Sequence, residues 1–193
     1  MKHDLTADAL IQLLHRYHPS GFLVDDPEYS ASEEAQRLNR LLRETMKDMQ
    51  AWNGFIQRLH EEFPGCPLWD RTLLQHDPCY ICEIALPGME MGGDRYDAII
   101  CLLSLLAPVY ALYAEHYLDT GPLRESWLRF PPFPPEYQAH EAKLASLIES
   151  TFGFTRLTHE VLSTPVPDLV PRSGTLGLGD ARLIDCLFTP HRP

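Results

Sequence analysis

The chain has 193 residues, of which 45% are hydrophobic and 22% are charged, so it is long and apolar enough for one folded domain and is not disordered by composition. Asp and Glu number 27 against 16 Lys and Arg, which gives a net charge of −11. A field of that sign repels nucleic acid and anionic lipid and attracts a basic protein, so we expect no nucleic-acid partner and no membrane partner.

The first predicted element is a helix near residues 7–17, where Thr6 stands in place to cap the first turn and apolar residues recur at helical spacing. The N-terminal stretch MKHDLTADALIQLL has acidic residues where an export signal would have a basic region followed by a longer apolar run, which predicts a cytoplasmic protein. The five cysteines are an odd number and fit free thiols in a reducing compartment. The loop that follows the helix holds Asp25, Asp26 and Glu28 without a cation.

A long helix is predicted near residues 31–63. Ser30 and Glu33 have the spacing of a capping box, and apolar residues then follow at intervals of three and four as far as Leu59. The segment is longer than an average globular helix, so a break near Asn53 and Gly54 stays open. Core packing explains its apolar stripe better than a coiled-coil partner does.

The most apolar stretch is 96–117, and residues 98–114 carry no charge. It is shorter than the about 20 residues of a membrane-spanning helix, and Pro108 interrupts it. Its β-branched and aromatic residues predict two strands, near 96–104 and 108–117, with apolar residues on both faces, so that both faces need cover. A buried helix is the alternative, because periodicity alone does not settle such a run.

The remaining predicted elements complete a single domain over 1–193. A strand is expected near 79–86, little regular structure over 121–135 where prolines are frequent, a helix near 136–151, a strand near 182–188, and a flexible tail at 189–193. These elements predict an α+β fold, with an antiparallel sheet packed against helices.

The residue patterns that could support chemistry are weak. One candidate metal site has nitrogen and sulfur ligands of the kind that zinc prefers, from His76, Cys79 and Cys82, with Cys66 as a fourth ligand. However, Cys79 and Cys82 would point to opposite faces of a strand. No nucleophile elbow, phosphate-binding loop or carboxylate dyad is present in the sequence. We therefore predict no catalytic residue, no cofactor and no metal site.

Several short segments, taken in order, resemble immunity proteins that protect bacteria against their own polymorphic or contact-delivered toxins of the Rhs or type VI kind. The segments are His18-Pro19-x-Gly21, Asp26-Pro27-x-Tyr29-x-x-Ser32-Glu33-Glu34, Trp52-x-x-Phe55, Ser104-Leu105-Leu106-x-Pro108-x-Tyr110, Thr164-Pro165-Val166-Pro167-Asp168 and Leu183-Ile184-Asp185-Cys186-Leu187-Phe188. The resemblance implies a small, acidic, non-catalytic inhibitor that binds a cognate toxin domain and covers its active site.

A toxin with a basic cleft would be attracted by carboxylates that have no cation beside them. The expected partner-binding residues are Asp25, Asp26, Glu28, Glu90 and Asp94.

Two other functions remain open. One is a small enzyme whose site is assembled from scattered residues such as His76, Glu83 and Asp97. The other is a structural subunit in which the segment 31–63 docks into a larger assembly.

Overall fold

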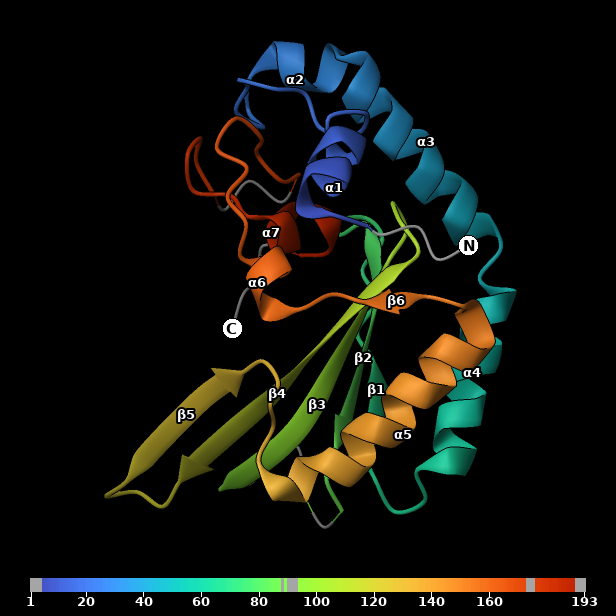
Figure 1. Cartoon of the computed structure of the whole chain (residues 1–193), viewed down its shortest axis with the longest axis vertical. Coiled ribbons are helices and arrows are strands. Elements are labelled where there is room, and N and C mark those ends of the chain that lie inside the picture. The colour runs from blue at the N-terminus through green and yellow to red at the C-terminus, as the bar shows by residue number, and fades with distance from the viewer. Residues whose placement is uncertain (1–4, 88, 90–93, 173–175, 190–193) are drawn as a thin grey trace.

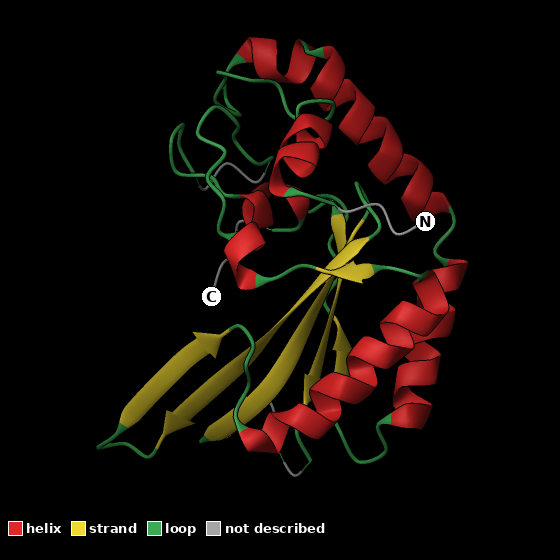
Figure 2. Ribbon diagram, in the orientation of Figure 1, coloured by secondary structure: helices red, strands yellow, loops and turns green. Residues whose placement is uncertain are grey.

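The computed structural model describes residues 5–87, 89, 94–172 and 176–189, and these form an α+β fold (Figures 1 and 2). The helices are α1 (Ala7–Leu14), α2 (Pro27–Ala31), α3 (Glu33–Lys47), α4 (Gln50–Glu62), α5 (Pro135–Phe152), α6 (His159–Leu162) and α7 (Leu183–Leu187). The strands are β1 (Leu68–Asp70), β2 (Cys79–Ala85), β3 (Arg95–Ser104), β4 (Val109–Asp119), β5 (Arg124–Arg129) and β6 (Thr155–Arg156).

The strands make one sheet in the order β1-β2-β3-β4-β5, with every neighbouring pair antiparallel. The two-residue strand β6 pairs with the start of β4 in parallel. The predicted α+β fold with an antiparallel sheet is therefore confirmed, with β6 as the parallel exception. The two strands expected in the apolar stretch are β3 and β4, which hydrogen-bond to each other along most of their length.

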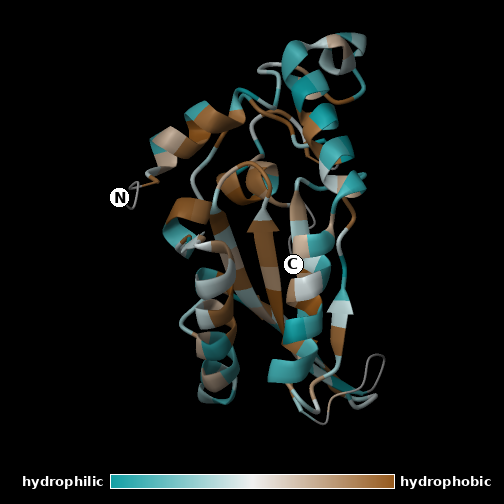
Figure 3. Cartoon of the chain, turned by 90° about the vertical axis from the view of Figure 1, so that its right-hand side faces the viewer, coloured by the Kyte–Doolittle hydropathy of each residue, from teal (hydrophilic) through white to brown (hydrophobic). Residues whose placement is uncertain are grey.

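Both faces of the central strands are buried, as the apolar alternation in 96–117 predicts. In β4, Val109, Ala111 and Tyr113 belong to one core cluster, and Tyr110 and Leu112 belong to the other. We call the first side the α1 face and the second side the α5 face. Figure 3 shows a largely brown central strand between helices whose residues range from teal to brown.

Different parts of the chain cover the two faces. On the α5 face, α4 and α5 lie side by side against the sheet (Figure 1), with the buried residues Trp52, Phe55, Leu59, Tyr137, Leu144 and Ile148. On the α1 face, helices from both ends of the chain contribute, with Leu10 and Leu14 of α1, Leu38 and Leu42 of α3 and all the apolar residues of α7. The N-terminal and C-terminal parts of the chain therefore meet over one face of the sheet.

The strand predicted near 182–188 is wrong, because residues 183–187 form the short buried helix α7. The backbone N–H of Arg182 donates to Asp185 Oδ2 at 2.7 Å, which starts the helix. The Ser104 hydroxyl donates to the carbonyl of Leu187 at 3.0 Å and satisfies one of the acceptors left at its end. A short apolar run without period fits a buried helix as well as a strand.

The helix predicted near 31–63 is two helices, α3 and α4, and the break lies at Asp48 and Met49 instead of at Asn53 and Gly54. Asp48 is extended, with φ −137° and ψ 94°, and its carboxylate accepts from the N–H of Gln50 at 3.1 Å. An Asp at such a point competes with the helix by bonding to the backbone nearby. Gly54 lies inside α4.

The other predicted elements differ from the structure mainly at their ends. The helix near 7–17 is α1, which ends at Leu14 and is followed by a turn, and the helix near 136–151 is α5 with Gly153 as its left-handed C-cap. The strand near 79–86 is β2. Residues 121–135, expected to be irregular, contain β5. The tail at 189–193 lies outside the described residues except for Thr189, which is buried.

Two glycines with opposite roles test these assignments. Gly153 has φ 69°, where a Cβ is strained, so Gly153→Ala should lower the free energy of unfolding by about 1 kcal/mol. Gly54 lies exposed within α4 and an added Cβ meets open space, so Gly54→Ala should raise it by about 1 kcal/mol. Urea unfolding followed by circular dichroism measures both, and changes of the same sign would contradict the assigned backbone.

Candidate functional site

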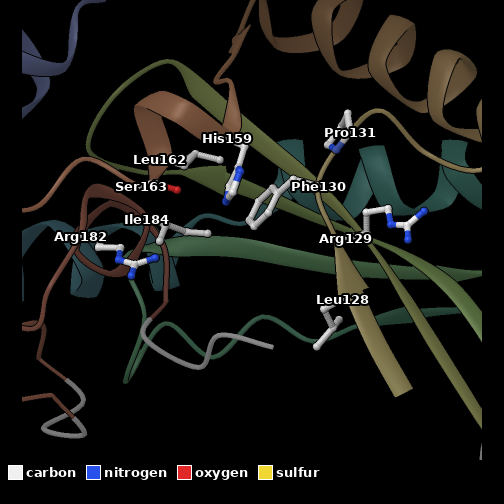
Figure 4. Close-up of a pocket in the computed structure, with 9 residues that line it drawn as sticks. All are labelled: Leu128, Arg129, Phe130, Pro131, His159, Leu162, Ser163, Arg182 and Ile184. Carbon is white, nitrogen blue, oxygen red and sulfur yellow. The ribbon is translucent and has the colours of Figure 1, made fainter. Parts of the chain in front are cut away.

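A cavity of about 520 Å³ lies on the α1 face, between the end of β5 and the helices α6 and α7 (Figure 4). Its walls are mostly apolar, with Leu128, Phe130, Leu162 and Ile184, and its polar groups include His159 and Arg182. The His159 ring stacks on Phe130 with centroids 4.6 Å apart. The lining therefore combines an apolar wall with the guanidinium groups of Arg129 and Arg182.

The hairpin of β4 and β5 extends from this cavity beyond the helices (Figure 1). Three of its residues are large, hydrophobic and exposed, with Tyr117 37%, Leu123 52% and Leu128 38% accessible. Since side chains alternate along a strand and Glu115 pairs with Leu128, Tyr117 and Leu128 lie on the same face of the hairpin. The cavity and the hairpin are therefore parts of one partly apolar surface.

Sequence reasoning missed this surface because it took 121–135 as irregular from its prolines. A hairpin signal is present in the same residues. Gly121 and Pro122 form a two-residue loop between two short apolar-polar runs, and Gly121 has φ 84°, which favours glycine. The Thr120 N–H donates to the Leu123 carbonyl at 2.9 Å and closes the turn.

A buried polar cluster lies on the α5 face, around Asp97 of β3. Asp97 Oδ1 accepts from the hydroxyl of Tyr137 at 2.7 Å and lies 2.6 Å from His116 Nδ1, while Oδ2 lies 2.7 Å from Nε of Arg95. The His116 ring in turn stacks on Trp127 of β5. Burial alone would raise the pKa of Asp97, but the hydrogen bonds from these three groups together lower it. With both oxygens occupied and 2% of the residue exposed, this carboxylate ties the two strands β3 and β4 to α5.

A second cluster lies on the α1 face, around Glu83 of β2. Glu83 is buried, pairs with Arg71 at 2.5 Å and accepts from the hydroxyl of Tyr96. Burial, and then the negative charge of Glu83, raise the pKa of Glu115. Glu83 is buried while Glu115 is half-buried, and the bonds of Glu83 to Arg71 and Tyr96 make this cluster a structural tie.

The residues named for a scattered catalytic site are not brought together. Glu83 lies on the α1 face, since its neighbours Cys82 and Ile84 pack in the other cluster. Asp97 bonds to Tyr137 on the α5 face, and His76 is exposed in the turn between β1 and β2. The sheet separates the two carboxylates, so His76, Glu83 and Asp97 form no joint site.

The expected partner-binding carboxylates fall at two ends of the molecule. Asp25 and Glu28 are exposed at the start of α2, and Asp26 beside them accepts from the N–H of Leu23 at 2.6 Å. Asp94 is exposed just before β3, at the opposite end of the sheet from α2 (Figure 1). Glu90 lies outside the described residues. The structure therefore groups the first three residues and separates them from Asp94.

The cysteine pattern behaves as the strand geometry predicts. Cys79 belongs to the core of the α1 face and Cys82 to that of the α5 face, and within the described residues none of the five cysteines forms a disulfide. Within the described ranges no group of three or more His, Cys, Asp or Glu residues is placed to hold a metal ion. No helix in those ranges has both the length and the apolar character that crossing a bilayer requires.

Most of the segments that carry the family resemblance hold the interior together. His18 lies 3.1 Å from the carbonyl of Cys186, and the Tyr29 hydroxyl donates to the carbonyl of Val170 at 3.2 Å. Asp168 accepts from the Ser20 hydroxyl at 2.6 Å and lies 2.8 Å from His15 Nε2. These bonds join residues 15–29 to residues 168–186, so the segments position the C-terminal part over the sheet.

In comparisons with known proteins, no family model, curated protein or solved structure matches this chain.

The buried His18 gives the protein a pH dependence that can be measured. Its Nε2 faces a carbonyl and therefore carries the proton of the neutral ring, while burial lowers its pKa to about 4 from 6.5. Between these pH values the unfolded chain binds a proton at His18 that the folded chain does not. The contribution of neutral His18 to the free energy of unfolding is therefore fully present above pH 6.5 and is lost as the pH falls toward 4. The loss should be about 3 kcal/mol.

The variant His18→Gln is the matched control, because glutamine keeps an N–H donor for the Cys186 carbonyl and does not titrate. Urea unfolding at several pH values should show a flatter profile for the variant between pH 6.5 and 4. His15 acts in the opposite direction, since its hydrogen bond to Asp168 raises its pKa, and it is present in both proteins. Parallel loss of stability in the two proteins would show that His18 is not held neutral.

Proposed function

We propose that this chain is a non-catalytic immunity protein that binds a cognate bacterial toxin domain and neutralises it by covering the active site with an acidic surface. The observation that carries the proposal is the acidic end formed by α2 and the start of α3. Asp25, Glu28 and Glu33 are exposed there, and the sequence has no Lys or Arg between Arg16 and Arg37. We call Asp25, Asp26, Glu28, Glu33 and Glu34 the acidic end.

The position of the acidic end supports an interaction role. It lies at the top of the molecule in Figure 1, away from the sheet, where a partner can approach it without displacing the core. Its carboxylates are held on a helix and a cap: the Ser32 hydroxyl accepts from the N–H of Ala35 at 3.1 Å, which starts α3 with Glu33 and Glu34 in its first turn. Negative charges at a helix start are stabilised there, so this acidic end is preorganised.

Cations also lie near this end, and Arg37 follows Glu33 by one turn of α3. Arg172, from the C-terminal part, lines a small cavity together with Val24, Tyr29 and Ser30. It lies on the inner side of α2, beside the buried Tyr29, and so neutralises part of the field that Glu28 and its neighbours produce. The exposed carboxylates on the outer side are the ones that a basic cleft would meet.

The burial of the polar clusters supports the non-catalytic part of the proposal. Asp97 and Glu83 have 2% and 4% of their surfaces exposed, and both are engaged by neighbouring side chains. A substrate would have to displace α5 or the α1-face cover to reach either carboxylate. We therefore propose inhibition by occlusion, with a toxin whose cleft is basic enough to bind nucleotide or nucleic acid. The protein would act in the bacterial cytoplasm.

The direct test is co-expression with the product of the neighbouring toxin gene. The chain should co-purify with that product and restore growth of cells that express it. Growth that stays arrested despite soluble expression of this chain would overturn the proposal, and so would turnover of a substrate by the purified chain alone.

Charge reversal should then locate the contact. A variant with Asp25→Lys, Asp26→Asn and Glu28→Lys should slow association with the toxin by at least about tenfold at low salt, because opposite charges steer the encounter. Asparagine at 26 keeps the oxygen that accepts from Leu23, so the loop is preserved. Stopped-flow or biolayer measurements report the rate.

Two control variants separate local from global charge. Changing Glu61, Glu136 and Glu160 to lysine alters net charge at least as much on exposed positions of α4, α5 and α6, and it should slow association much less. Asp94→Lys tests the other end of the molecule alone. Equal slowing by the α2 variant and by the Glu61 control set would mean that net charge matters and the acidic end does not.

A further inference from the structure

The strand β5 is an edge of the sheet, and its outer side is open. Within the described residues it pairs only with β4, and Figure 2 shows it extending past the helices at the lower left. Five of its six residues are exposed. An exposed edge strand presents unpaired N–H and C=O groups to another strand.

The turn shows which groups of β5 point outward. The Thr120 N–H donates to the Leu123 carbonyl, so Thr120 and Leu123 form a hydrogen-bonded pair of the β4–β5 ladder. The next residue of β4, Asp119, directs its N–H away from β5, to the Asp94 carbonyl beside β3. Since hydrogen-bonded and non-hydrogen-bonded pairs alternate, Glu125 and Trp127 direct their backbone groups toward β4. Arg124, Ser126 and Leu128 direct theirs away from the sheet.

We infer that this edge pairs with the same edge of a second copy of the chain, antiparallel and centred on Trp127. In that register the outward groups of Ser126 meet those of Leu128 in the second copy, and the bonds form twice by symmetry. Glu125 then lies opposite Arg129 of the second copy, also twice, on the face where both copies carry Trp127. Non-hydrogen-bonded pairs of this kind bring side chains closest.

The charges on β5 select this register from its neighbours. Centring on Ser126 would place Glu125 opposite Trp127 and Arg124 opposite Leu128, with no ion pair. Centring between Ser126 and Trp127 would place Arg124 opposite Arg129, and like charges opposite one another destabilise a sheet. Only the register centred on Trp127 meets both requirements. It places outward-pointing backbone groups opposite one another, and it places Glu125 opposite Arg129 of the second copy.

The side chains on this face are already in place for such a contact. Trp127 stacks on His116 at 5.0 Å between centroids, and the Arg129 guanidinium carbon lies 5.0 Å from the Trp127 ring centre. The Arg129 guanidinium is therefore held beside Trp127, at the centre of the proposed contact. A six-residue strand is a small contact, so we expect a dissociation constant in the micromolar range, at the weak end of specific interfaces.

The dimer is tested with the full chain by sedimentation equilibrium over a range of micromolar concentrations. Salt at about 0.15 M limits the repulsion between two acidic copies to a range of about 8 Å. Glu125→Arg and Arg129→Glu should each weaken the dimer by at least about tenfold, since each places like charges opposite one another. The double variant exchanges the two charges and should restore it.

A proline variant tests the backbone contact separately. Ser126→Pro removes an N–H that points away from β4, so the hairpin should stay folded and the dimer should be lost. Trp127→Pro, which removes an N–H that bonds to β4, is the comparison that should disturb the fold itself in the circular dichroism spectrum. A monomeric wild-type chain at these concentrations would overturn the proposal, as would a dimer unaffected by Ser126→Pro or not restored by the charge exchange.

Discussion

The fold depends on a pair of strands that is apolar on both faces. Residues 98–114 carry no charge and form most of β3 and β4, with buried side chains pointing alternately to the two sides. Such a pair is unstable in water unless both sides are covered. The α5 face is covered by two helices adjacent to it, while the α1 face needs segments from both chain ends. This requirement brings residues 10–42 and 157–188 together over one face.

Burial of apolar side chains alone does not fix the position and orientation of these two segments on the sheet, because the hydrophobic effect is not directional. Directional bonds supply that information. His18 and Ser104 reach the carbonyls of Cys186 and Leu187 at the end of α7, and Asp97 joins β3 and β4 to Tyr137 of α5. A buried polar group without a partner is costly, so each of these residues admits few arrangements.

Sequence could predict what depends on local pattern. β-Branched and aromatic residues identified β3 and β4, and strand alternation placed Cys79 and Cys82 on opposite faces. The prediction from sequence failed where hydrogen bonds between distant parts of the chain determine the secondary structure. The run at 183–187 is apolar without period, and its helical form depends on Asp185 and on partners far along the chain. The site was less predictable still, because carboxylates with the same local pattern, Asp26 and Asp94, lie at opposite ends of the sheet.

Because helices of the same chain cover both faces of the central strands, a protein partner can contact helix surfaces, loops, strand edges and the exposed β4–β5 hairpin. Of the two outer strands, β1 has three residues and β5 has six, so β5 offers the longer edge. The acidic end, formed by α2 and the start of α3, lies at the top of Figure 1, far from this hairpin at the lower left. A toxin bound at one place and a second copy bound at the other would therefore not compete. Dimerisation would then present two acidic ends from one assembly and raise the effective concentration of inhibitor for any toxin that carries two sites.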